Sequence, residues 1–275
     1  MKITAGMIVF NAEKFAPVGM LQAQLEQLYF LADQIVIVEG ATKSDNKTHY
    51  FDGDATWCTE DGKSNDSTVS IIKNFPDPQN KIILVEAKGF WNGKTQMCNE
   101  WSKVANGDYI WQIDVDEFYH KKDILKIKNI LQKYEPNAVH FFANHFWGDY
   151  FNCIDESCPY TWGNNLPWRR IFRHKPGSKW QSHEPPVYLL PDGTDCNTLQ
   201  LIPREETLKV GLKMFHYSYV TPEQISFKAR FYKQSWTEQT YKDWLVDKAT
   251  PVNGSSTKPF TGQHPEWLTK IIPIK

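Results

Sequence analysis

Three carboxylates within four residues follow one apolar segment of this 275-residue chain, and they are the side chains best suited to chemistry. The segment 109–113, Tyr-Ile-Trp-Gln-Ile, is expected to be a buried strand, and Asp114, Asp116 and Glu117 come directly after it. Because residues two apart in a strand face the same side, Asp114 and Asp116 are expected to point into one crevice. Such a pair is costly unless a cation or a proton lies between them, and hard oxygen ligands favour Mg²⁺ or Mn²⁺. The alternative is that the acids solvate a strand end and cap the next helix.

Apolar segments alternate with amphipathic ones around these acids, which predicts a mostly parallel α/β sheet. Strands are expected over 3–10, 34–38, 81–85 and 109–113, and helices over 68–74 and 120–134. A further helix is expected to begin at Pro17. Another follows Lys94, with Val104 on its core face and Gly107 as its C-terminal cap.

Polar residues lie at several of the predicted strand ends, where ligands of parallel α/β sheets bind. Asn11 and Glu13 follow the first strand, and Glu39 ends the second. Lys94 begins a helix after a glycine-bearing loop, where free N–H groups can bind phosphate. Lys94 is therefore a candidate diphosphate contact, or else a solvated surface lysine.

The second half of the chain offers a candidate base and a third candidate metal ligand. His183 and Glu184 stand before two prolines, and either could be a base. His216 lies in a predicted strand over 213–219, as a metal ligand or as a core residue. Lys228, on the helix that starts with the capping box Thr221–Gln224, could meet phosphate. The tail is expected to fold back as a lid or a packing arm.

Composition narrows the class of protein. The formal net charge of −1 argues against nucleic acid as a partner, since phosphate backbones bind basic patches. Five cysteines, an odd number, suggest reduced thiols and a cytoplasmic protein, with Cys153 and Cys158 as a zinc half-site or a local disulfide. Neither a signal peptide nor a run of about 20 apolar residues is present, so no transmembrane segment is expected. The 11 Trp, 12 Tyr and 16 Phe can stack on sugars or fill the core.

Four segments, in order and spacing, resemble one family. They are Met7–Glu13, Ile35–Gly40, Lys94–Asn99 and Asp114-Val115-Asp116. The chain is similar to nucleotide-sugar-dependent glycosyltransferases of the GT-A fold, family 2-like, over residues 3–120 and more loosely beyond. Glu39 departs from the pattern, because many relatives carry Asp there.

The resemblance implies a GT-A fold, with a Rossmann-like, mostly parallel nucleotide-binding sheet and a mixed C-terminal acceptor side. It implies one continuous domain, in which 1–120 binds the nucleotide sugar and 121–275 binds the acceptor and carries the catalytic base.

The implied activity is inverting, metal-dependent transfer of a hexosyl group from a nucleoside diphosphate sugar, UDP favoured and GDP possible, to a hydroxyl of a glycan or another acceptor. The implied site comprises Asn11, Glu13, Glu39, Lys94, Asp114, Val115 and Asp116 for the nucleotide sugar, Asp114, Asp116 and His216 for Mn²⁺ or Mg²⁺, and Glu184 or His183 as the base.

Two alternatives remain open. A sugar nucleotidyltransferase would use a similar sheet, but the segment Asn11–Lys14 is not the glycine-rich basic loop expected after its first strand. A carbohydrate-binding protein with a degenerate site would bind glycans without Asp114 or Asp116. Dinucleotide binding and ATP hydrolysis lack support, because neither Gly-x-Gly-x-x-Gly nor a P-loop pattern occurs.

Overall fold

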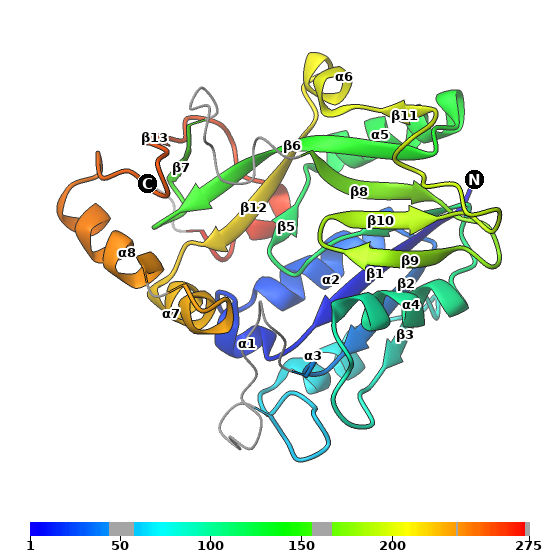
Figure 1. The fold of residues 1–275 in the computed structure, drawn as a ribbon, viewed down its shortest axis with the longest axis horizontal. Coiled ribbons are helices and arrows are strands. Elements are labelled where there is room, and N and C mark those ends of the chain that lie inside the picture. Colours follow the sequence, from blue (N-terminus) through cyan, green and yellow to red (C-terminus); the bar gives the residue numbers. More distant parts are fainter. Residues whose placement is uncertain (44–57, 156–166, 235, 273–275) are drawn as a thin grey trace.

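Four parallel strands form the centre of the structure, a computed structural model that describes residues 1–43, 58–155, 167–234 and 236–272. They are β1 (Ile3–Val9), β2 (Gln34–Glu39), β3 (Ile82–Val85) and β4 (Tyr109–Gln112), in the spatial order β3-β2-β1-β4. Val9 pairs with Glu39, so the carboxyl ends of β1 and β2 meet at one edge. The predicted parallel α/β core is confirmed (Figure 1).

Beyond β4 the sheet becomes mixed. β8 (Trp168–Arg173) pairs antiparallel with β4 and with β6 (Ala138–Trp147), and β6 pairs in parallel with β12 (Lys213–Tyr219). The shorter strands β5 (Glu117–Phe118), β7 (Asn152–Ile154), β11 (Leu201–Ile202) and β13 (Thr257–Pro259) extend this part. β9 (Lys179–His183) and β10 (Pro186–Leu189) form a separate hairpin.

Helices cover both faces of the sheet because alternate strand residues are apolar on both sides. On one face, Ile35 and Ile37 pack in a cluster with α2 (Met20–Leu31), α3 (Thr68–Asn74) and α5 (Lys121–Tyr134). On the other, Val36 and Val38 pack with α4 (Lys94–Val104) and the β9–β10 hairpin. Gly6 allows this second packing, because a Cβ there would lie 1.9 Å from the ring of Trp101.

Three expected helix features are wrong. Pro17 does not start a helix: a one-turn helix, α1 (Ala12–Phe15), comes first, and α2 begins after Gly19. Val104 is 41% exposed rather than on the core face of α4. Gly107 is not the cap, since Ala105 ends the helix; instead Gly107 lies against Thr4, whose backbone nitrogen would be 2.5 Å from a Cβ.

The C-terminal part packs back onto the sheet. It contains α6 (Arg204–Lys209), α7 (Pro222–Phe231), α8 (Trp236–Val246) and a 3₁₀ turn, η1 (Glu266–Leu268). Trp267 in this turn donates its indole N–H to the carbonyl of Tyr119 at 2.8 Å, and its ring lies 5.5 Å from that of Phe30. The tail is therefore a packing arm, one of the two forms expected.

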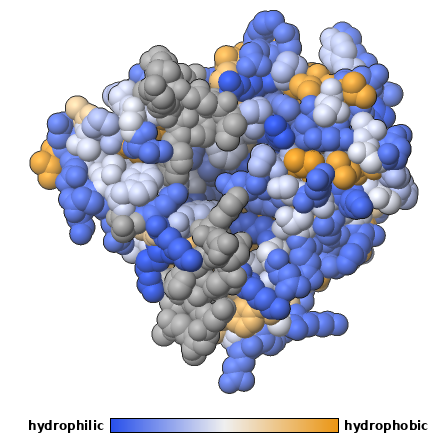
Figure 2. Space-filling model, viewed as in Figure 1, coloured by the Kyte–Doolittle hydropathy of each residue, from blue (hydrophilic) through white to orange (hydrophobic). Residues whose placement is uncertain are grey.

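The face of the molecule in Figure 2 is mainly hydrophilic, and its apolar groups form small separate patches. Within the part of the chain that the structure describes, no helix has the length and apolarity needed to span a bilayer. Cys153 is buried in β7, and the pairing considered for it with Cys158 involves a residue outside the described ranges.

Candidate active site

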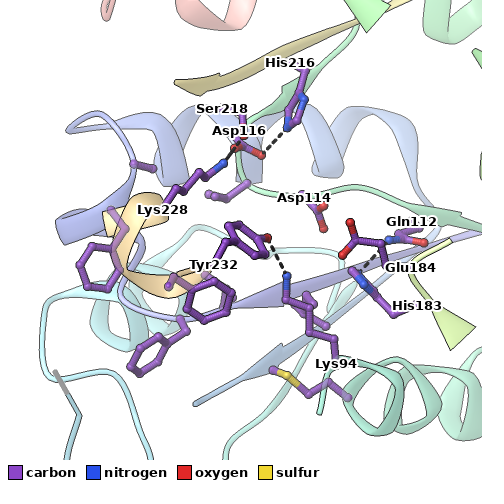
Figure 3. A pocket seen from close by; sticks show the side chains of 18 of the residues that line it. Lys94, Gln112, Asp114, Asp116, His183, Glu184, His216, Ser218, Lys228 and Tyr232 are labelled. Atoms are coloured by element: carbon purple, nitrogen blue, oxygen red, sulfur yellow. Dashed lines mark hydrogen bonds and ion pairs between the residues drawn. The ribbon is translucent and has the colours of Figure 1, made fainter. Parts of the chain in front are cut away.

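A cavity of about 490 Å³ lies at the carboxyl ends of β1, β2 and β4. Its walls come from both halves of the chain: α1 and the first turn of α4, then β8, the β9–β10 turn, β12 and α7. Eight of the residues singled out from the sequence line it: Lys94, Asp114, Val115, Asp116, His183, Glu184, His216 and Lys228. Figure 3 shows the labelled side chains that face this space.

The two aspartates reach the cavity from a turn rather than from a strand. β4 ends at Gln112, and the N–H of Glu117 donates to the carbonyl of Asp114 at 3.1 Å, which reverses the chain. Both acids line the same cavity, as expected, but the turn and not the alternation of a strand directs them there. Gln24 on α2 fixes the turn by donating to the carbonyls of Asp114 at 2.5 Å and Glu117 at 2.8 Å.

Asp116 is a compensated carboxylate. The ammonium of Lys228 lies 3.2 Å from its Oδ2, and His216 Nε2 lies 3.6 Å from its Oδ1. Burial favours the neutral form, but Lys228 and His216 outweigh it and hold the pKa of Asp116 well below its ordinary value. The other ring nitrogen of His216 lies 3.0 Å from Nδ1 of His145.

Asp114 lacks such compensation. Its Oδ1 is buried without a hydrogen-bond partner among the described residues, and Arg170 lies 3.9 Å from its Oδ2. Burial and the charge of Glu117 raise the pKa of Asp114 to about 6, which Arg170 only partly offsets. Since Arg170 is already bound to Glu117, Asp114 has an oxygen and a negative charge available to a cation.

Lys94 is held at the first turn of α4, against α7. Its ammonium is 3.2 Å from the hydroxyl of Tyr232 and 5.4 Å from the centre of the Phe231 ring. Burial alone would lower the pKa of Lys94, but Tyr232, Asp114 and Glu184 raise it, so the side chain stays charged. Lys94 is therefore a partly buried cation in the cavity wall and not a fully solvated surface lysine.

His183 and Glu184 enter the cavity from the β9–β10 turn. The ring Nε2 of His183 lies 3.3 Å from the side-chain nitrogen of Gln112. Burial, Lys94 and Arg170 lower the pKa of His183 well below its ordinary value, so the imidazole is neutral. Glu184 lines the same space, as Figure 3 shows.

Three predicted nucleoside contacts lie behind the cavity wall. Asn11, Glu13 and Glu39 are not among the residues that line it. Glu39 accepts the N–H of Ser64 at 2.6 Å, and Asn11 accepts the N–H of Asn65 at 2.9 Å. In the structure Glu39 and Asn11 order the segment after residue 58, and the expectation that Asn11, Glu13 and Glu39 border the nucleoside stays a prediction.

Sequence reasoning missed several lining residues. Gln112, Arg170 and Tyr232 line the cavity, and so do the aromatic side chains of Phe15 and Phe227, whose rings stack at 3.7 Å. The sequence did hint at Gln112, because it is a polar residue inside an otherwise apolar strand. No signal in the sequence indicated the aromatic pair, because Phe15 lies on α1 and Phe227 lies on α7, far apart in the chain.

The cavity offers only a small number of protein ligands for a metal ion. Among the described residues, no group of three or more His, Cys, Asp or Glu side chains is arranged to hold a metal ion. Asp114 fits the requirement for one carboxylate oxygen, since its Oδ1 lacks a partner. Mg²⁺ in nucleotide sites is often bound through one or two carboxylates, with water and phosphate as the other ligands.

Comparison with known protein families gives a match over just under half of the chain. A sequence profile described as glycosyl transferase family 2 matches residues 51–180. A search of curated proteins found no match.

Solved structures resemble the fold at a distance. The S. aureus protein TarS 1–349 aligns at 14% identity and a TM-score of 0.40, over 63% of this chain and 47% of that chain. The same protein in complex with UDP-GlcNAc gives 14%, 0.40, 63% and 45%. The mannosyltransferase PcManGT from Pyrobaculum calidifontis, in complex with GDP-Man and Mn²⁺, gives 14%, 0.38, 62% and 44%. This chain thus spans less than half of each, and the likeness transfers neither substrate nor metal.

The parallel sheet with its mixed extension and the profile match agree with the resemblance read from the sequence. The chain has the mixed α/β architecture expected of a GT-A fold, and over residues 51–180 it is similar to glycosyl transferase family 2.

Proposed function

We propose that this protein transfers a sugar, a hexose in the first instance, from a nucleoside diphosphate sugar to a hydroxyl of a glycan, with inversion. The observation that carries the proposal is the cavity at the strand ends, where the Asp114–Asp116 turn faces Lys94 and Lys228. The match to glycosyl transferase family 2 supports the reaction class. We also propose one continuous domain, with the donor side in 1–120 and the acceptor side in 121–275, although α7 contributes to the donor end.

In this proposal the diphosphate binds between Lys94 and Lys228. Lys94 and Lys228 are both partly buried cations that line the cavity from different helices, and charge-assisted hydrogen bonds to phosphate are strong in such surroundings. The nucleoside is placed against the wall of Phe15 and Phe227, beside Gly40 and Ala41. UDP is the first candidate nucleotide and GDP the second.

Mn²⁺ or Mg²⁺ is proposed at Asp114, with Asp116 and His216 as further candidates. When bound, the ion would neutralise part of the charge that develops on the leaving diphosphate. Asp114 has the available oxygen, whereas both oxygens of Asp116 already face cationic or potentially cationic groups.

Glu184 is proposed as the base, ahead of His183. Inversion with an oxocarbenium-like transition state needs one base to take the proton of the acceptor hydroxyl. The strongly lowered pKa of His183 makes its ring a weak base, and its Nε2 is already next to Gln112. Glu184 lines the cavity and carries a carboxylate.

Calorimetric titration of UDP and GDP tests the proposal. We expect one nucleotide to bind with Mn²⁺ present, and binding to weaken strongly after chelation and in Asp114→Ala or Asp116→Ala. The control is Asp192→Ala, an exposed acid in a distant turn, which should bind as the unchanged protein does. If neither nucleotide binds while a glycan does, the protein is a carbohydrate-binding protein and the proposal fails.

A further inference from the structure

Lys228 reaches the acidic turn from an element distant in sequence. Its ammonium lies 3.2 Å from Asp116 Oδ2, across 112 residues of chain, and also donates to the hydroxyl of Ser218. The same ammonium lies 4.8 Å from the centre of the Tyr219 ring. Figure 3 shows the lysine extending along the cavity wall to the carboxylate.

The packing of α7 fixes this lysine in place. The helix begins at Thr221, whose side chain accepts the N–H of Gln224 at 3.3 Å. One residue before Lys228, the Phe227 ring stacks on Phe15 at 3.7 Å. The Lys228 side chain is only 16% exposed, so its charge is directed at Asp116 instead of being solvated.

This arrangement opposes a metal ion on Asp116. A divalent cation on that carboxylate would lie beside the Lys228 ammonium, and like charges repel strongly where little water separates them. His216 stands at the other carboxylate oxygen, at 3.6 Å. A diphosphate changes the balance, because its several anionic oxygens can bind an ammonium and a metal ion at once.

We propose that Lys228 makes metal binding depend on the nucleotide: it occupies Asp116 in the empty site and moves to the diphosphate when the donor enters. The inference rests on the proposed function, because the ligand that releases Asp116 is the nucleoside diphosphate. Lys228 then has two partners one after the other, first Asp116 and then the diphosphate. The binding of the metal and the binding of the nucleotide are therefore coupled in free energy. By linkage, each ligand raises the affinity for the other by the same factor.

The test is a calorimetric titration of Mn²⁺ with and without UDP, or GDP if that is the nucleotide bound. In the unchanged protein, we expect weak binding of Mn²⁺ alone and an affinity about tenfold or more higher with the nucleotide. In Lys228→Met, Mn²⁺ alone should bind about tenfold more tightly, while the nucleotide binds more weakly and the coupling shrinks. Lys228→Arg should retain the coupling.

Lys242→Met, an exposed lysine on α8, is the matched control and should leave every affinity unchanged. Thermal unfolding gives a second readout: Mn²⁺ alone should raise the melting temperature of Lys228→Met more than that of the unchanged protein. Lys228→Gln serves the same comparison if the methionine variant does not fold. Equal Mn²⁺ affinity in the variant and the unchanged protein overturns this inference alone, whereas failure of the unchanged protein to bind UDP or GDP overturns the proposed function as well.

Discussion

Asp114 and Asp116 stand two residues apart, yet their carboxylates have opposite electrostatic surroundings. Asp116 lies against Lys228, which lowers its pKa, and Asp114 lies near Glu117, which contributes to raising its pKa to about 6. Asp114 therefore has less positive charge around it than its own negative charge requires. Such a local loss of folding stability is common at sites that bind a ligand.

Removing the charge of Asp114 should stabilise the fold. Its pKa is raised from 3.8 to about 6, so the folded protein binds this proton more tightly than the unfolded chain does. The free energy of unfolding then falls as pH rises through this window, and the cost is complete above it. Asp114→Asn, without metal, should melt a few degrees higher at pH 7.5, using about 2–4 °C per kcal/mol for a protein of this size.

The measurement is thermal unfolding at pH 7.5 and pH 5 in the presence of a chelator. The advantage of Asp114→Asn should shrink at pH 5, where the aspartate of the unchanged protein is mostly protonated. A variant that melts lower than the unchanged protein at pH 7.5 would contradict the assigned surroundings of Asp114.

Glu184 and His183 can be separated by rate. Glu184→Gln should lower the rate of sugar nucleotide hydrolysis, with water in place of the acceptor, by about 10²–10⁴-fold, because it removes the proposed base. Its affinity for the nucleotide should stay within about twofold, since the change leaves the lysines in place. His183→Gln should lose much less rate; the reverse order of losses would assign the base to His183.

Among the elements, β5 and β8 are joined at the site by a buried ion pair. Arg170 on β8 donates to both carboxylate oxygens of Glu117 on β5, with 2.8 Å between Nε and Oε2, and Glu117 is fully buried. A buried pair of this kind is weak evidence for net stability, but removing one partner leaves an uncompensated charge. Glu117 thereby acts as a positioning residue for the acidic turn.

Arg170→Met should destabilise the protein by about 3–5 kcal/mol, because Glu117 would remain buried without its partner. The double variant Arg170→Met with Glu117→Gln should recover most of that loss, since both charges are gone. Denaturant unfolding measures both values. If the double variant were as unstable as the single one, packing rather than charge would explain the effect.

The elements themselves were largely predictable from the sequence. Apolar segments gave β1, β2, β3, β4 and β12 within a residue or so, and Thr221 with Pro222 gave the start of α7. Pro17 was misplaced because the one-turn helix α1 intervenes, and a four-residue helix has too few residues to show a period.

Short motifs identified part of the site, and Lys94, His216 and Lys228 were identified singly. Asp114, Asp116, His183 and Glu184 were identified from short motifs, and all four line the cavity. Glu39 accepts the N–H of Ser64, 25 residues away, which the sequence did not indicate, and its expected contact with the nucleoside stays a prediction. A strand-end acid looks the same in the sequence whether it faces a ligand or a loop, and only the packed structure distinguishes the two cases.

At the scale of the whole molecule, the cavity joins segments from the first strand to α7. A ligand that fills it should stabilise the fold as a unit, by about 2.7 kcal/mol at 100 times its dissociation constant. With UDP and Mn²⁺, or GDP if that nucleotide binds, amide hydrogen exchange should slow in α7 as well as at the ends of β1 and β4. Slowing confined to residues 1–120 would show that α7 does not close on the nucleotide.

The stack of Phe227 on Phe15 places one of the last-formed helices against one of the first, as Figure 1 shows for α7 and α1. On the ribosome, β1, β2, β3 and β4 emerge early, and the acidic turn follows them directly. Lys228 is added 112 residues after Asp116. A nascent chain that has released the acidic turn but not α7 therefore holds Asp116 without the ammonium of Lys228, and its cavity acquires its final wall only after residue 234 has been made.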